Sequence, residues 1–193
     1  QARQLGVELL ESCEVTRVIR EGHNFLADGM EFRFDRVVNA AGPWAIEILD
    51  QSGISIRRRL DLVRGSHLVL EARCPQALLL EVPGERRVFF VLPWEGNTLV
   101  GTTEVQHDIC EPVQCTSAER AYLLRAFGHY FPDATPTVAH EFAGIRPLVR
   151  SSGHPRQASR EYYIERNGNV LTILGGKWTT SLALARKVSK MIH

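Results

Sequence analysis

The chain has 193 residues, of which 44% are apolar and 23% charged, and these proportions exclude disordered, collagen-like and coiled-coil chains. The length suits one domain or two small lobes that share a core. Lys and Arg number 23 against 22 Asp and Glu, so a net charge of +1 gives no field that would hold nucleic acid. We therefore expect no nucleic-acid partner.

The strand patterns differ between the first fifty residues and the rest of the chain. The first fifty residues carry short strand patterns that end in small residues, typical of a nucleotide-binding lobe. After Gly53 the patterns lengthen and are separated by hairpin turns, which indicates antiparallel sheet. A capping box at residues 116–119 marks one helix. In chain order, we predict strands at residues 7–10, 14–20, 31–39, 57–71, 77–82, 87–93, 98–104, 137–149, 161–165 and 170–174, and helices at residues 44–49, 116–131 and 179–192.

The order of these elements predicts two interleaved lobes of α/β and α+β class. Residues 1–55 and 168–193 would form a partial Rossmann-like lobe, and residues 56–167 a mainly antiparallel β-sheet lobe with helices. A chain that leaves a nucleotide-binding sheet, builds a β-rich lobe and returns has the plan of two-domain flavoenzymes. In that plan the active site lies between the lobes.

Cysteine usage and hydropathy indicate the compartment. The four cysteines are scattered, with no C-x-x-C pair and no histidine at zinc spacing, so we expect reduced thiols, no metal site and a cytoplasmic protein. No apolar run approaches the roughly 18–20 residues of a membrane span. The chain opens at Gln1, and its first residues resemble the tail of a helix rather than a signal peptide. We therefore expect a fragment that is soluble or bound peripherally to a membrane.

Two turns of small residues follow predicted buried strands. Asn39-Ala-Ala-Gly-Pro-Trp44 would let backbone approach a cofactor closely, or it is an ordinary tight turn that needs glycine. Leu174-Gly-Gly-Lys-Trp-Thr-Thr180 opens a helix, whose first amides would stabilise a flavin edge or a phosphate. The ordinary interpretation of the second segment is a glycine-rich turn with Thr179 or Thr180 as N-cap.

Two arginines and a histidine complete the candidate residues. Arg146 stands alone in an apolar strand, and a buried guanidinium needs an anion, either an acidic side chain or a substrate carboxylate or phosphate. Arg160 begins a later strand and taken alone is an ordinary surface charge. His67 ends the segment Arg64-Gly-Ser-His67, which we expect to interrupt a strand. Its imidazole suits proton transfer near neutrality, although a strand histidine is more often structural.

Together these segments resemble the amino-acid-oxidase-like family of FAD-dependent oxidoreductases, and within it the FAD-dependent glycerol-3-phosphate dehydrogenases. The matching segments occur in the family's order and span nearly the whole chain. Arg-Gly-Ser-His and Gly-Gly-Lys-Trp-Thr-Thr point to the glycerophosphate branch. The segments are residues 37–44, 64–67, 91–94 with 100–104, 143–148, and 175–180.

The resemblance implies FAD as the cofactor and assigns residues to two sites. His67 and Arg146 are implied as catalytic residues, and His67, Arg146, Arg160 and Lys177 as the substrate-binding set, with the cations holding phosphate. The strand around Val15 is implied to offer backbone to the adenine. The full set of implied FAD-binding residues is Val15, Ala41, Gly42, Trp44, Gly175, Gly176, Lys177, Trp178, Thr179 and Thr180.

The reaction that the resemblance implies is oxidation of sn-glycerol 3-phosphate to dihydroxyacetone phosphate, a step of glycerol metabolism. Hydride would pass to the flavin while His67 or a neighbouring group takes the hydroxyl proton. The implied electron acceptor is a quinone at the inner face of the membrane, or oxygen. Two alternatives stay open: a 2-hydroxy acid or amino acid held by Arg146, and a non-catalytic binding module that keeps the motifs as structure.

The sequence also departs from the family's pattern. It contains no G-x-G-x-x-G, with which the family seats the FAD pyrophosphate, and no helical cap domain follows the last helix. We therefore expect the chain to be the carboxyl-terminal half of an oxidoreductase domain. Its partner would be the missing amino-terminal half of the FAD domain, and the chain alone would be inactive.

Overall fold

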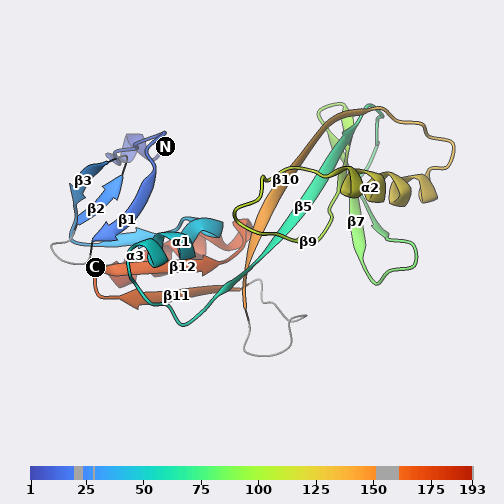
Figure 1. The fold of residues 1–193 in the computed structure, drawn as a ribbon. Helices are drawn as coiled ribbons and strands as arrows, with labels where there is room; N and C mark the ends of the chain where they lie inside the picture. The colour runs from blue at the N-terminus through green and yellow to red at the C-terminus, as the bar shows by residue number, and fades with distance from the viewer. Residues whose placement is uncertain (20–23, 28, 151–160, 193) are drawn as a thin grey trace. The chain divides into compact units, whose positions relative to one another are not determined.

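A computed structural model of the chain describes residues 1–19, 24–27, 29–150 and 161–192. The chain divides into two compact units, Gln1–Leu60 with Leu148–His193, and Asp61–Pro147. Figure 1 shows the mixed α/β architecture, with more strand than helix. None of the helices in the described ranges is long and apolar enough to cross a membrane.

The described part of the first unit contains two three-stranded sheets. One is an antiparallel sheet in the order β1-β2-β3, and the other has the order β11-β12-β4. In the second sheet β12 pairs antiparallel with β11 and parallel with β4. The elements are η1 (Arg3–Leu5), β1 (Val15–Ile19), β2 (Asn24–Ala27), β3 (Met30–Arg33), β4 (Val37–Asn39), η2 (Gly42–Trp44), α1 (Ala45–Gln51), β11 (Tyr162–Asn167), β12 (Val170–Gly175), η4 (Trp178–Thr180) and α3 (Ser181–Ile192).

Helix α1 is the centre of the first unit's core. Its Leu49 is fully buried and packs with Val18 of β1 and Val170 of β12, while its Ala45 packs with Leu174. Helix α3 is amphipathic in sequence as predicted, yet only Val188 of the helix is buried within the described chain. The apolar stripe of α3 therefore lies largely at the surface.

Two sequence-based predictions about this unit are corrected by the structure. Residues 7–10 form no strand, because no strand among the described residues pairs with them and their side chains lie exposed. The first unit resumes at Leu148 rather than at residue 168. Val149 at the end of β10 is buried against Ala45 and Leu174, and β11 pairs with β12 along its whole length through the tight turn at Gly168, so both segments belong to the first unit.

The second unit is built on a six-stranded sheet in the order β10-β5-β8-β7-β6, with β9 paired to β5. Helix α2 covers one face, and its predicted capping box between Thr116 and Glu119 is present. The elements are β5 (Leu60–Leu70), β6 (Leu78–Glu81), β7 (Val88–Trp94), β8 (Asn97–Gly101), β9 (Val105–Gln106), α2 (Ser117–Tyr130) and β10 (Val138–Val149).

Strand alternation gives this sheet two different faces. Leu68, Phe89 and Val100 are buried and pack with Leu123 and Phe127 of α2. The strand β5 runs unbroken through residues 64–67, so the predicted interruption is wrong. Two antiparallel partners follow one another along it, β9 opposite residues 63–64 and β8 opposite residues 67–70, and they keep the backbone extended.

Candidate functional site

Two of the predicted cofactor segments leave the same edge of one sheet. In the first unit Val37 of β4 lies opposite Val170 of β12, and Asn39 lies opposite Thr172, in parallel register. Parallel strands end at one edge, which is where open α/β sheets bind their ligands. The turn that follows β4 and the turn that follows β12 therefore emerge on the same side of the sheet, although most of the chain separates them in sequence.

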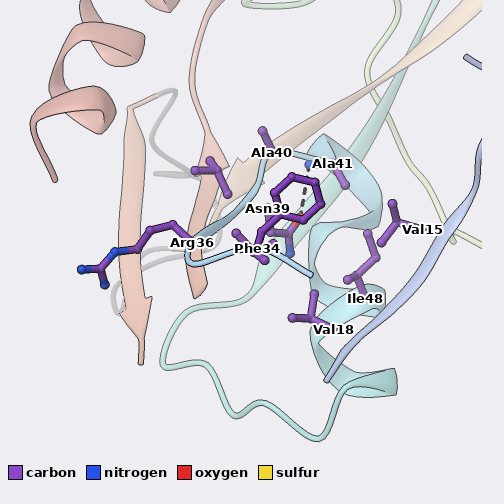
Figure 2. Close-up of a pocket in the computed structure, with 10 residues that line it drawn as sticks. Val15, Val18, Phe34, Arg36, Asn39, Ala40, Ala41 and Ile48 are labelled. Atoms are coloured by element: carbon purple, nitrogen blue, oxygen red, sulfur yellow. Dashed lines mark hydrogen bonds between the residues drawn. The ribbon is translucent and has the colours of Figure 1, made fainter. Parts of the chain in front are cut away.

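The side chain of Asn39 shapes the first turn. It is buried at the end of β4, and its Nδ2 donates to the Ala45 carbonyl at 2.9 Å. Its Oδ1 accepts from the Ala41 N–H at 3.2 Å (Figure 2). Gly42 then takes a φ of +58°, which favours glycine. The turn therefore presents the backbone of Ala41 and Gly42 at the sheet edge.

A pocket of about 310 Å³ adjoins this turn. Figure 2 shows Val15 and Ile48 on its walls, while the guanidinium of Arg36 points away from the other labelled side chains. The pairing of β1 with β2 shifts between Val15 and Arg17, so Thr16 has no partner residue on β2. Such a bulge on an edge strand leaves main-chain groups that the ladder does not use. The pocket is lined by Val15, Val18, Phe34, Arg36, Val37, Val38, Asn39, Ala40, Ala41 and Ile48.

The second turn contains two consecutive glycines in the left-handed region. Gly175 has a φ of +69° and Gly176 a φ of +98°, so both positions favour glycine. The helical turn η4 begins directly afterwards with Lys177 as its N-cap, and no side chain caps it. Both the N–H and the Oγ1 of Thr180 donate to the Lys177 carbonyl at 3.1 Å. Lys177 and Trp178 are exposed, the latter at 92%.

In the second unit, Arg146 lies against a glycine of β5. Its Nη2 donates to Thr102 Oγ1 at 2.8 Å, and its Nη1 donates to the Thr103 carbonyl at 3.3 Å. A Cβ added to Gly65 would lie 2.5 Å from both Arg146 Nη1 and Thr102 Oγ1, closer than real Cβ contacts come. Gly65 of the Arg-Gly-Ser-His segment therefore makes room for the guanidinium.

His67 lies on the face of β5 that points away from α2. Its ring stacks on Phe142, with centroids 5.0 Å apart and planes 11° apart. Gly101 is its cross-strand partner, and a Cβ there would collide with the imidazole. Nδ1 of His67 is buried without a hydrogen-bond partner among the described residues. Burial, and secondly the charge of Arg146, lower the pKa of His67, so the ring is neutral at pH 7.

The structure groups the predicted site residues into two sets. Ala41 and Val15 line the pocket of the first unit, and the Gly175–Gly176 turn leaves the same sheet edge as Gly42. His67 and Arg146 lie close enough in the second unit for the charge of Arg146 to act on the imidazole. The convergence of Arg146, Arg160 and Lys177 on one anion stays a prediction, since Arg160 lies outside the described residues and Lys177 belongs to the first unit.

Sequence reasoning missed the roles of two buried polar residues. Asn39 was not singled out, although an amide at the end of an apolar strand, just before small residues, is a recognisable turn-shaping signal. Glu119 was expected only as a member of the capping box. In the structure it also binds Arg64 and Ser66 of β5, and Thr103 in the segment between β8 and β9.

The class of protein follows from the sheet edge, the pocket and the His67–Arg146 face taken with sequence comparison. The chain belongs to the DAO family, FAD dependent oxidoreductase, which matches residues 1–191.

Among its relatives are aerobic glycerol-3-phosphate dehydrogenases. The chain is 32% identical to that of Staphylococcus haemolyticus, over the whole of this chain and 38% of the relative, and 33% identical to that of Staphylococcus aureus strain USA300, over 81% of this chain and 30% of the relative. It therefore spans about a third of the length of the curated relatives that it matches.

Solved structures give the same fold. The glycerol-3-phosphate dehydrogenase from Bacillus halodurans, complexed with FAD, superimposes with a TM-score of 0.81 and 28% identity, over 95% of this chain and 38% of that one. Glycine oxidase from Geobacillus kaustophilus matches with a TM-score of 0.67 and 22% identity, over 94% of this chain and 47% of that one, which is a likeness of fold alone. The predicted fold class and FAD-dependent family are thus confirmed.

Proposed function

We propose that this chain supplies the substrate face and part of the FAD site of an oxidoreductase that converts sn-glycerol 3-phosphate to dihydroxyacetone phosphate. The observation that carries the proposal is that a partly buried His67 with a lowered pKa lies on the same sheet face as the guanidinium of Arg146 and feels its charge. The identity to aerobic glycerol-3-phosphate dehydrogenases supports this substrate over the others that the fold serves.

The residues of the first unit fit an FAD molecule. The apolar pocket beside Val15 suits a flat heterocycle, and the bulge at Thr16 offers main-chain groups to its polar edge. The amides around Gly42 and the start of η4 suit the anionic and ring portions of the cofactor. When bound, FAD supplies an acceptor for the hydride of the alcohol carbon.

The chain's own residues would then handle the proton and the anion. With its pKa lowered by burial and by Arg146, the imidazole of His67 is unprotonated at neutral pH and able to accept the proton of the substrate hydroxyl. Phe142 stacks on the ring and holds its plane. Arg146 would bind an oxygen of the substrate beside the ring, and we propose Lys177 and Arg160 as further cations for the phosphate.

Electron transfer onward requires a partner beyond this chain. We propose a quinone, or another small acceptor, that takes the electrons after each turnover. A peripheral site at the inner face of the membrane would bring the enzyme to such an acceptor.

The test uses a hybrid enzyme, namely the Bacillus halodurans glycerol-3-phosphate dehydrogenase with its matching segment replaced by this chain. Stoichiometric FAD absorbance is checked first, and dye reduction is then measured with glycerol 3-phosphate, glycerol, lactate and glycine. We expect glycerol 3-phosphate to be by far the best substrate. A hybrid that binds no FAD, or that prefers glycine or lactate, contradicts the proposal.

Two variants of the hybrid enzyme separate the roles of the site residues. His67→Ala is expected to lower kcat about 10²–10⁴-fold, because a general base is removed. Arg146→Lys keeps the charge but loses the planar fork, so kcat/KM for glycerol 3-phosphate is expected to fall by about 5–150-fold, or about 1–3 kcal/mol. Unchanged turnover of His67→Ala at saturating substrate would return that residue to a structural role.

A further inference from the structure

Glu119 is a buried carboxylate that binds more groups than a helix cap requires. Its side chain is 5% exposed, and besides Thr116 it accepts from Arg64 Nε at 3.1 Å, from Ser66 Oγ at 2.9 Å and from Thr103 Oγ1 at 2.7 Å. Burial alone would raise the pKa of Glu119, but the hydrogen bonds from Thr103, Thr116 and Ser66 lower it to about 2. The carboxylate is therefore ionised and fully engaged with two segments of the sheet.

Thr103 connects this carboxylate to the opposite face of the sheet. Its hydroxyl donates to Glu119 and accepts from the Ser66 N–H at 2.9 Å. Its carbonyl accepts from Arg146 Nη1, while the hydroxyl of the preceding Thr102 accepts from Arg146 Nη2. One dipeptide thus binds Glu119 on one side and the guanidinium of Arg146 on the other.

Residues of β5 tie the same network to His67. Ser66 donates its Oγ to Glu119 and is flanked by Gly65, which lies beneath Arg146, and by His67. Since side chains alternate along a strand, those of Arg64 and Ser66 point to α2, whereas that of His67, and the position a side chain at Gly65 would take, lie on the opposite face with Arg146. Fixing Ser66 therefore also fixes the backbone that carries His67.

We propose that Glu119 is a positioning residue, which holds the Thr102–Thr103 dipeptide in the geometry that orients Arg146 for substrate. Glu119 touches neither substrate nor cofactor in this proposal and acts through Thr103. The proposal rests on the proposed function for the identity of the substrate, but the placement of Arg146 is a property of the second unit itself.

The test compares threonine variants in the hybrid enzyme. Thr103→Val removes the hydroxyl that binds Glu119 at nearly constant shape, and Thr103→Ser keeps that hydroxyl. Thr98→Val is the matched control, because Thr98 is also buried and its Oγ1 also donates, to the Ala72 carbonyl, without a bond to the Arg146 network. Glu119→Gln removes the charge of the carboxylate itself. Each variant is made with Arg146 and with Arg146→Lys, and kcat/KM for glycerol 3-phosphate is measured.

We expect Thr103→Val and Glu119→Gln to lower kcat/KM about 10-fold when Arg146 is present, and less than about 2-fold beside Arg146→Lys, because the effect passes through the guanidinium. Thr103→Ser and Thr98→Val should stay within about 2-fold of the parent. Equal losses in both backgrounds, or a loss in Thr98→Val as large as in Thr103→Val, would overturn the inference.

A structural readout separates this inference from the substrate assignment. Crystal structures of the Thr103→Val and Thr98→Val hybrids should show the Arg146 guanidinium displaced in the first and unmoved in the second. If the parent hybrid does not oxidise glycerol 3-phosphate, the proposed function fails while this comparison still decides the role of the network. An unmoved Arg146 in Thr103→Val refutes the positioning role.

Discussion

The contact between Gly65 and Arg146 predicts a large functional effect from one methyl group. In Gly65→Ala the new Cβ would stand 2.5 Å from Arg146 Nη1 and from Thr102 Oγ1. Ordinary carbon contacts begin near 3.5 Å, so the guanidinium has to withdraw by about 1 Å. That movement stretches its bonds to Thr102 and Thr103, now 2.8 and 3.3 Å long, beyond hydrogen-bond range.

The size of the effect follows from the bonds that are lost. A hydrogen bond made by a charged group contributes about 1.5–3 kcal/mol, so misplacing the guanidinium should lower kcat/KM for glycerol 3-phosphate by about 10–150-fold. Stability should fall as well, because Thr102 Oγ1 has to move together with the guanidinium and the hydrogen bonds between them are lost. Steady-state kinetics of the hybrid enzyme, with a thermal melt beside them, measure both quantities.

Gly144→Ala is the matched control for this prediction. Gly144 lies on β10 two residues before Arg146, and a Cβ there meets nothing within 4 Å. Its kinetics should therefore equal those of the parent. If Gly65→Ala also keeps parental kcat/KM, the inference that Gly65 exists to accommodate Arg146 is refuted.

Three further predictions concern stability and cofactor binding. Glu119 has a pKa of about 2 against an ordinary 4.5, so its contribution to stability is complete above pH 4.5 and is lost as the pH falls toward 2. Melting temperatures across this range should therefore fall more steeply for the parent than for Glu119→Gln. Parallel curves for the two proteins would contradict the assignment. Gly128→Ala in α2 meets no atom within 4 Å and should raise the free energy of unfolding by about 0.5–1 kcal/mol in a denaturant titration, whereas a loss would show a hidden contact. The isolated chain, which lacks G-x-G-x-x-G, should purify without stoichiometric flavin absorbance, and a yellow one-to-one complex would contradict this expectation.

Local patterns predicted most of the elements, because their signals are short in range. The capping box at Thr116 and Glu119 and the apolar spacing of Leu123 and Phe127 define α2, and both features are in the structure. The segment 7–10 failed because alternation alone does not form a strand without a neighbour to pair with. The return boundary was displaced because pairing of β11 with β12 is a property of the hairpin and not of either strand.

The sequence suggested the candidate residues of the site but not the residues that hold them in place. Arg-Gly-Ser-His suggested His67 as a candidate, but the reason for its glycine appears only when Arg146, far away in sequence, is placed against it. The second function of Glu119 was hidden for the same kind of reason, since it depends on Thr103 and Ser66 from two other segments. A short motif predicts local conformation, but it does not predict contacts with residues that are distant in sequence.

The parallel pairing of β4 with β12 affects how the chain folds while the ribosome synthesises it. Val37 emerges early, but its partner Val170 emerges only after the entire second unit has been made. The second unit is one continuous segment of sequence, so it is able to fold before β12 has been synthesised and paired with β4. Until then the apolar faces of Val37 and Leu49 remain uncovered by Val170. Slow elongation, or a stall before β12, would leave these strands open to misassociation and make holdase chaperones most important at that moment.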